Sequence, residues 1–308
     1  MGYEMIRLSM VLLITLVLFA QGAHAGNRVT GGVEFSSDSD DADQYGVYLG
    51  YSHRFDDSAY KPEWGFRGGV LTLNDVSGSE RFKVLELNHR SDLSENIHLD
   101  LKGKLYQGDD WSPALYAANL VYGPTRKWYA EVFAERGIVD SVTSARLEYT
   151  VDTYGVSADY NITDEFTVVG ALFTQDFSDG NDRLGRVGRI VYTPRNHDWF
   201  NVQLKGRVLE SDFNGIGYFS PDRLEEYFLL FGAAKAFGGD NWVIRGLAGP
   251  GIQVIDDENK EAYWAEARLK GWFTPEFGLD TRFGCTTAQA TSESYRYCFG
   301  HANLIYAW

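Results

Sequence analysis

The histidines are the first residues to consider for catalysis, because near neutral pH they serve as general acids, general bases and metal ligands. His53, His89, His98, His197 and His301 are scattered along the chain, with no serine or aspartate at a telling spacing. Nucleophile-elbow sequences and metal-binding histidine clusters are both absent from the sequence. We therefore expect no catalytic residues, no metal site and no cofactor, and predict a protein that is not an enzyme. A site assembled from distant strands would escape this search, so an enzyme stays the alternative.

The two cysteines, Cys285 and Cys298, are the other residues whose spacing suggests chemistry. They fall on consecutive expected strands, nearly equidistant from a turn around Thr291–Ser294. An antiparallel register centred on that turn places them opposite each other, within reach of a disulfide in an oxidising compartment. The alternative is two unrelated apolar fillers.

The amino-acid composition indicates which secondary-structure elements position these histidines and cysteines. The chain has 308 residues, 15% of them aromatic, with 33 glycines and only 7 prolines, which favours one large all-β domain. Its net charge of −15 argues against nucleic acid as a partner. A mean hydropathy of −0.28 excludes a bundle of transmembrane helices.

Residues 1–25 have the pattern of a cleaved secretory signal peptide. Arg7 provides a weakly basic start, Leu8–Ala20 is apolar, and Ala23-His24-Ala25 matches a cleavage site. A short membrane anchor is the alternative, but the apolar run is too short to span a bilayer comfortably. We expect residues 26–308 to form the exported domain.

That domain contains about sixteen strand-like runs separated by turn residues. We place them at 28–36, 44–55, 64–74, 81–90, 97–106, 114–123, 128–136, 146–162, 166–177, 184–193, 199–211, 225–237, 242–254, 262–273, 277–287 and 295–308. The run 146–162 is longer than one strand needs. Helical periodicity is not evident anywhere in the domain.

Several runs alternate between apolar and charged positions, which fits either a soluble sandwich or a membrane barrel. The connections favour the barrel, because short turns alternate with longer acidic segments at Ser37–Asp43, Gly108–Pro113, Ser178–Arg183, Asp212–Leu224 and Asp256–Glu261. Nearly every short turn is followed by an aromatic residue, as in an interfacial girdle. These residues are Trp64, Trp128, Phe166, Trp199, Trp242 and Phe277.

The C-terminus supports the same prediction. Leu304, Tyr306 and the final Trp308 alternate along the last strand. They resemble the terminal signal of bacterial outer-membrane proteins, which the barrel-insertion machinery reads. The fold class we predict is all-β: a transmembrane antiparallel β-barrel of about sixteen strands in the outer membrane of a Gram-negative bacterium. Membrane lipid and lipopolysaccharide are then expected partners.

The acidic segments invite a calcium interpretation, since carboxylates are suitable ligands. The EF-hand spacing is absent from Asp38–Asp43 and from Asp256–Glu258. Loose bridging of divalent cations to lipopolysaccharide phosphates is a further interpretation. Plain solvation is the one we favour.

A barrel of this size cannot fill its interior with side chains, so the default function is a pore. Alternation places a set of polar residues on the inward face: Asp100, Lys102, Lys104, Glu131, Glu135, Asn201, Gln203, Lys205, Arg207, Glu266, Arg268, Lys270, Asp280 and Arg282. One interpretation is a solvated lumen whose charges pair with one another. The other is a track that holds a polar polymer weakly at many sites, with Tyr106, Tyr129 and Trp264 offering flat faces to sugar rings. Trp272 shares this alternation, but we favour a girdle position for it.

The longest expected connection contains Gly217, Tyr218, Phe219, Ser220, Pro221, Asp222 and Arg223. This segment resembles a motif in the C-terminal barrel of the outer-membrane subunit of bacterial cellulose synthase, related to the poly-N-acetylglucosamine export porin. The resemblance covers about Asp212 to Trp308 and implies a sixteen-stranded barrel that exports a polysaccharide. Those porins carry tetratricopeptide repeats ahead of the barrel and this chain has none, so export would need a separate periplasmic scaffold protein.

The segment itself allows two roles. Gly217 and Pro221 could simply make a turn, or Gly217, Tyr218, Phe219, Ser220, Pro221 and Arg223 could form a loop that gates the mouth. We therefore carry three hypotheses: export of an exopolysaccharide, diffusion of small hydrophilic solutes or sugars, and an adhesion or phage-receptor barrel.

Overall fold

The computed structural model describes residues 26–38, 42–55, 61–125, 127–239, 241–287 and 296–308. The expected signal peptide, residues 1–25, lies outside the described residues. So do the turn expected around Thr291–Ser294 and part of the acidic segment Ser37–Asp43.

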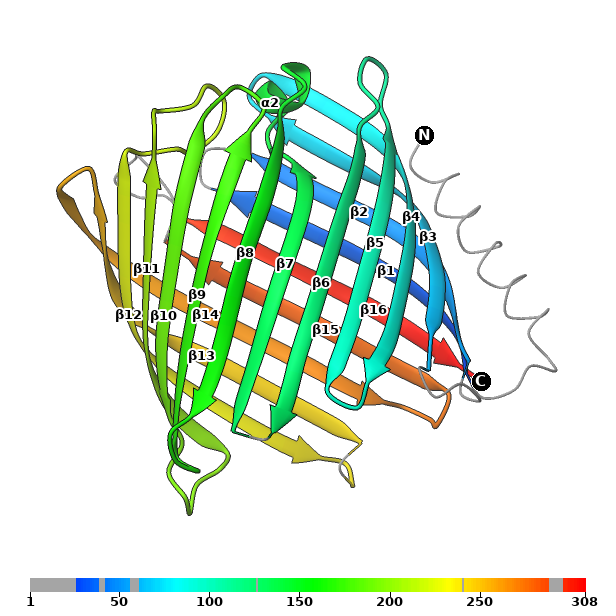
Figure 1. The fold of residues 1–308 in the computed structure, drawn as a ribbon. Helices are drawn as coiled ribbons and strands as arrows, with labels where there is room; N and C mark the ends of the chain where they lie inside the picture. The colour runs from blue at the N-terminus through cyan, green and yellow to red at the C-terminus, as the bar shows by residue number, and fades with distance from the viewer. Residues whose placement is uncertain (1–25, 39–41, 56–60, 126, 240, 288–295) are drawn as a thin grey trace.

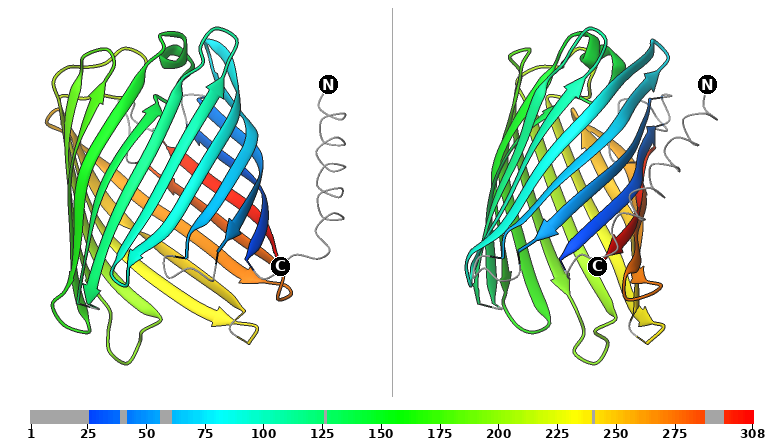
Figure 2. Two further views of the ribbon diagram at one scale, coloured as in Figure 1. Left: turned by 45° about the vertical axis from the view of Figure 1, so that its right-hand side comes forward. Right: turned by 90° about the vertical axis from the view of Figure 1, so that its right-hand side faces the viewer.

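Sixteen antiparallel strands close into one barrel, which confirms the predicted fold class (Figures 1 and 2). Each strand pairs with its neighbours in the chain, and β1 pairs with β16 to close the ring. The strands are β1 (Asn27–Asp38), β2 (Asp43–Arg54), β3 (Glu63–Asp75), β4 (Gly78–Ser94), β5 (Ile97–Gln107), β6 (Ala114–Thr125), β7 (Trp128–Ile138), β8 (Thr150–Asn161), β9 (Phe166–Phe177), β10 (Asp182–Tyr192), β11 (Phe200–Ser211), β12 (Arg223–Phe237), β13 (Trp242–Ile255), β14 (Glu258–Trp272), β15 (Phe277–Thr286) and β16 (Tyr297–Ala307). Within the described ranges, no helix is long and apolar enough to cross a membrane.

The barrel has two distinct ends. At the first, which we call the turn end, β1 begins and β16 stops, so that Asn27 and Trp308 exchange two backbone hydrogen bonds of 3.1 Å. At the opposite end, which we call the loop end, a short helix α2 (Val142–Arg146) lies near the top of Figure 1. The strands run obliquely between these ends, as a closed barrel requires (Figure 2).

The outer surface is apolar because alternate side chains of every strand face outward. Val47, Leu87 and Leu204 are 55%, 59% and 56% exposed, although each is a large hydrophobic residue. A water-soluble protein buries such residues, whereas a membrane barrel turns them toward lipid. The expected aromatic girdle lies at the turn end, where Trp64 and Trp199 are among the most exposed rings.

The run 146–162 is not one strand, which corrects the sequence-based boundaries. Residues 142–146 form helix α2, and β8 begins only at Thr150. Ser141 caps the helix by accepting a hydrogen bond from the Ser144 amide, and Glu148 adopts a left-handed φ of 60° that interrupts the extended backbone. The β7–β8 connection, residues 139–149, is therefore as long as the β11–β12 connection, residues 212–222.

The expectation of a long connection at Asp256–Glu261 is also wrong. Only Asp256 and Asp257 connect β13 to β14, and both have positive φ, at 46° and 73°. Aspartate tolerates this conformation better than most residues, and two such residues make a tight hairpin turn whose twist matches the strands. The connection expected at Ser178–Arg183 is likewise shorter in the structure, because β10 already begins at Asp182.

Candidate functional site: the barrel lumen

The most regular polar wall of the lumen lies on β14 and β15. The Arg268 guanidinium donates to Asp280 at 3.1 and 2.7 Å, and that of Arg282 donates to Glu266 at 2.9 and 2.8 Å. All four residues belong to the predicted lumen set. Their paired, two-bond geometry fixes the arginines in place.

On β11, the predicted residues contact β12 and β14. The Lys205 ammonium lies 4.0 Å from the centre of the Trp264 ring, a cation–π contact. Arg207 forms an ion pair with Glu226, which is almost wholly buried. Gln203 donates to Asn201 at 2.8 Å.

The remaining predicted residues lie on β5, β7 and β14. Arg90 Nε donates to Asp100 at 2.7 Å, Lys104 Nζ is 4.0 Å from Glu86, and Tyr129 donates to Glu131 at 2.9 Å. Glu135 lines a cavity toward the loop end of the lumen, together with Asp140 and Tyr297. Lys102 and Lys270 occupy inward positions opposite Asn88 and Asp280.

The structure therefore brings most of the predicted lumen residues into cross-strand pairs. Sequence reasoning missed several of their partners, among them Arg90, Glu86 and Glu226. Each lies on a strand whose alternation is visible, so the same parity argument would have found them. Their pairing could not be read, because it depends on the register between strands.

Part of the lumen wall is apolar, although the expected lumen residues are all polar or charged. Phe228 and Leu230 on β12 are 3% and 1% exposed and pack with Ala262 and Trp264 of β14. β12 is apolar on both faces, so alternation gives no signal there.

Helix α2 folds into the barrel. Val142 and Ala145 are 1% and 4% exposed and pack against Leu71, Leu73 and Phe82, on the inner faces of β3 and β4. On its exposed side, Arg146 Nε donates to Glu80 at 2.8 Å. The apolar face of this one-turn helix anchors the β7–β8 connection to the wall formed by β3 and β4.

The β11–β12 connection meets this helix from the other side. The Ser141 and Ser144 hydroxyls donate to the Gly217 carbonyl at 2.5 and 3.1 Å. Gly217 has a φ of 84°, and a Cβ at this position would lie 2.7 Å from Cγ2 of Thr143. Only glycine satisfies both the left-handed backbone and the close approach.

The rest of the β11–β12 connection packs on β9 and β10. The Tyr218 ring stacks on Phe177 with centroids 4.6 Å apart, and Asn181 donates to the Ser220 hydroxyl at 2.7 Å. Phe219 contacts a buried cluster that includes Leu224. Together, residues 139–149 and 212–222 connect the β3–β4 wall to the β9–β10 wall, and we call this pair of connections the lumen bridge.

The last two residues of the expected gating segment lie at the end of the bridge and beyond it. Pro221 is buried at the edge of the bridge. Arg223 is the first residue of β12 and forms ion pairs with Glu225 and Glu210, at 2.6 and 3.3 Å. Its side chain lies on the outer face of the barrel, because it has the same parity as the exposed Tyr227 and Leu229.

A cavity of about 960 Å³ lies beside the lumen bridge, lined by both of its connections. Asp140 belongs to this cavity and is open to lumen water, although the barrel wall surrounds it. That enclosure raises the pKa of the Asp140 carboxyl to about 6; Lys104 opposes the shift, and Glu34 and Glu135 add to it. The loop end of the lumen therefore carries a carboxyl that titrates closer to neutrality than an ordinary aspartate.

The two cysteines and the C-terminal residues lie on β15 and β16 or directly after them, next to the β1–β16 pair that closes the barrel. Cys285 and Cys298 stand opposite each other on β15 and β16 and form a disulfide, with Cα atoms 4.1 Å apart. Leu304 is exposed on the outer face. Tyr306 and Trp308 lie together at the turn end, with ring centroids 5.2 Å apart.

The residues that suggested metal chemistry do not assemble in the described part of the chain. There, no group of three or more histidine, cysteine, aspartate or glutamate side chains is arranged to hold a metal ion. His98 pairs with Asp92 at 2.6 Å, and His53 with Asn27 at 2.8 Å.

Comparison with known proteins was made by sequence and by structure. No family model and no curated protein matches the sequence. Among solved structures, the barrel is similar to a bacterial polysaccharide outer membrane secretin, with a TM-score of 0.71, 10% identity, and coverage of 93% of this chain and 99% of that one. CdiB from Acinetobacter baumannii has a TM-score of 0.53 at 11% identity, over 92% of this chain and 61% of CdiB. OprD from Pseudomonas aeruginosa has a TM-score of 0.50 at 9% identity, over 92% and 95%. At these identities the likeness is one of fold: the chain has the fold of outer-membrane barrels.

Proposed function

We propose that this protein is an outer-membrane pore of a Gram-negative bacterium that exports a polysaccharide. The observation that carries the proposal is the end-to-end similarity to the polysaccharide secretin. The finer resemblance, to the barrels of the cellulose synthase subunit and the poly-N-acetylglucosamine export porin, is part of the proposal. The turn end would face the periplasm and the loop end the exterior, as short turns and long loops do in such barrels.

The lumen chemistry supports a polymer more than a rigidly bound ligand. Charged pairs on β14 and β15 and the Lys205–Trp264 contact offer several weak contacts in sequence. A transported chain must be held at several sites and still leave each of them. Partners of this pore would be membrane lipid and lipopolysaccharide, the barrel-insertion machinery, and a separate periplasmic scaffold protein.

The lumen bridge supplies the gate in this proposal. It crosses the loop end through hydrogen bonds from two serines to a single carbonyl, and such contacts break and form at low cost. We expect the intact protein to show low, intermittent conductance in planar bilayers.

Replacing residues 213–220 with a short Gly-Ser linker should convert that behaviour to a large, steady current. The replacement leaves Leu224 and the β12 ladder intact, so the barrel should stay folded and heat-modifiable on a denaturing gel. As the control, Asp257 alone is exchanged for Gly, which suits its positive φ and leaves in place the Asp256 carboxylate that accepts from the Arg223 amide at 2.9 Å. A wild-type pore that is already open and indifferent to the replacement would reject gating.

Diffusion of small solutes is the second candidate, favoured by the similarity to OprD. Deleting the gene from its host separates the candidates. Export predicts loss of a surface polysaccharide, measured by sugar analysis of washed cells and restored by complementation. Unchanged polysaccharide with slower uptake of small sugars would favour the diffusion porin, and loss of phage adsorption or cell adhesion alone would favour a receptor barrel.

A further inference from the structure

Four residues of the lumen wall, one on each strand from β13 to β16, follow one another directly across the sheet. Arg245 stands opposite Arg268, Arg268 opposite Arg282, and Arg282 opposite His301. The next residue in this direction is Glu34 of β1, opposite His301. Like charges directly opposite each other on neighbouring strands destabilise a sheet. We call Arg245, Arg268 and Arg282 the basic row, and its cost to the sheet needs a reason.

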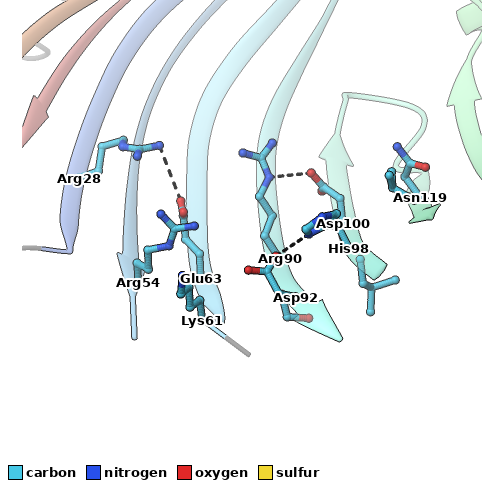
Figure 3. Close-up of a pocket in the computed structure, with 12 residues that line it drawn as sticks. Arg28, Arg54, Lys61, Glu63, Arg90, Asp92, His98, Asp100 and Asn119 are labelled. Carbon is cyan, nitrogen blue, oxygen red and sulfur yellow. Dashed lines mark hydrogen bonds and ion pairs between the residues drawn. The ribbon is translucent and has the colours of Figure 1, made fainter. Parts of the chain in front are cut away.

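Elsewhere in the barrel, such rows alternate in sign. Across β3, β4 and β5, Glu63 stands opposite Arg90, which in turn stands opposite Asp100. Figure 3 shows these three residues in the pocket that β1 to β6 line, where Arg90 Nε donates to Asp100 at 2.7 Å. A second row on the same strands also alternates, through Arg67, Glu86 and Lys104. The register pairs opposite charges there, whereas the basic row sets three arginines side by side.

All three arginines of the basic row are accessible from the lumen. Arg245 follows Ile244, which is 46% exposed on the outer face, so Arg245 points inward. Arg245 is exposed, and the side chains of Arg268 and Arg282 are each 41% exposed. A ligand in the lumen can therefore reach them without displacing the wall.

The two carboxylates of this wall are each held by one arginine. Asp280 accepts two hydrogen bonds from Arg268, and Glu266 accepts two from Arg282. These pairs neutralise two of the cations and leave none of the carboxylates for others.

Two further cations, Arg245 and Lys270, have no such partner. Lys270 is exposed beside the basic row and stands opposite Asp280, which Arg268 already holds. In the part of the chain that the structure describes, no carboxylate forms an ion pair with Arg245 or Lys270. β13 begins at Trp242, so about 10 Å of strand separates Arg245 from the turn that contains Asp240, which lies outside the described residues. The wall therefore carries four cations against two carboxylates.

Half-way round the ring, the wall formed by β6 to β9 has the opposite character. β7 and β8 lie eight strands away from β15 and β16. Glu131, Glu135 and Asp159 point inward there. Among the described residues of these four strands, the only basic one is Arg136, which pairs with Asp152 on the outer face. The excess of positive charge is thus confined to one side of the lumen, and an anion inside the barrel is drawn to that side.

We infer that the basic row, with Lys270, binds the anionic groups of an acidic polysaccharide during its passage through the pore. A guanidinium fork matches the two oxygens of a carboxylate or a phosphate, as the pairs with Asp280 and Glu266 illustrate. Such a group would neutralise the charge of Arg245 and Lys270 and offset the repulsion along the row. The inference rests on the proposed function, because an exported polymer is what brings these anions to the row.

Isothermal titration calorimetry on the purified protein in detergent tests the inference directly. The probes are trigalacturonate, which carries carboxylates, and glucose 6-phosphate, with neutral maltotriose as the control ligand. We expect at least one anionic probe to bind, with an affinity that falls as salt is added, and maltotriose not to bind. The probe that binds tells carboxylate from phosphate. Failure of both anionic probes, or equal binding of maltotriose, would overturn the inference.

The variant Arg245→Gln, Lys270→Gln removes the two cations that lack a carboxylate partner and keeps both bidentate pairs. Its affinity for the anionic probe should fall about 10-fold. The matched control, Arg186→Gln, Lys235→Gln, removes one arginine and one lysine from the outer face and should bind as the wild type does. Heat-modifiability shows that each variant is folded. Wild-type affinity in the first variant, or an equal loss in the control, would reject the basic row as the site.

The gene deletion described above separates this inference from the export proposal. Anion binding that depends on Arg245 and Lys270, together with unchanged surface polysaccharide after the deletion, would reject export and keep the site. Loss of surface polysaccharide in the deletion strain, with no binding of either anionic probe, would reject the site and keep export.

Discussion

At the residue scale, the contact between the two connections of the lumen bridge depends on Gly217. Gly217→Ala combines a left-handed backbone with a methyl group 2.7 Å from Thr143, so we expect the bridge to loosen and single-channel conductance to rise. Gly180→Ala is the matched control, because Gly180 has a similar φ of 89° and no atom within 4 Å of the added carbon. Both variants carry the left-handed cost of about 1–2 kcal/mol, but only the first carries the clash. Equal conductance in the two would show that the contact does not restrain the bridge.

The raised pKa of Asp140 leads us to expect that the ion selectivity of the pore depends on pH. Enclosure raises the pKa of this carboxyl to about 6, so it is neutral below that pH and negative above it. Cation selectivity should therefore increase as the pH rises through about 6, measured as a reversal potential in a salt gradient. Asp140→Asn should remove this step, whereas Glu225→Gln, on the outer face, should leave it. A step that survives in Asp140→Asn would show that this carboxyl does not cause the pH dependence.

At the element scale, the disulfide links the hairpin of β15 and β16 across a sequence separation of 13 residues. Closing a loop of this size stabilises a protein by about 3 kcal/mol, chiefly by restricting the unfolded chain. The double variant Cys285→Ser, Cys298→Ser should therefore lower the free energy of unfolding by about that amount, measured with guanidinium in detergent. Reductant should lower the wild type to the same level and leave the variant unchanged. Equal stability of oxidised wild type and variant would contradict this.

At the scale of the whole molecule, closure of the barrel involves the last residue of the chain. Trp308 exchanges two backbone hydrogen bonds with Asn27, and its ring lies 6.4 Å from that of Tyr51. Deleting Trp308 should reduce the heat-modifiable fraction in outer membranes, because it removes both the final pair of the seam and the proposed insertion signal. Trp308→Phe keeps an aromatic end and the backbone pair, and should assemble nearly as the wild type does. Normal assembly of the deletion would remove Trp308 from both roles.

The sequence by itself determined the barrel. Alternation in runs such as 97–106, turn residues at regular spacing and the girdle positions each follow from local chemistry, since strand periodicity and turn preference act over a few residues. The same parity selected Arg268, Asp280 and Arg282 as inward residues before any partner was known. The position of Cys298 opposite Cys285 followed from the symmetry of one hairpin.

Only the tertiary structure decided what the lumen contains. Helix α2 is too short to show a period, and its burial depends on Leu71 and Phe82, which lie far away in the sequence. The Gly217 carbonyl meets Ser141 and Ser144 across more than seventy residues of chain. The pocket lined by Arg28, Arg90 and Asn119 likewise forms only where β1 to β6 lie side by side in the curved sheet. Contacts across a closed barrel depend on its curvature and register, and these are properties of the whole ring of strands rather than of any one of them.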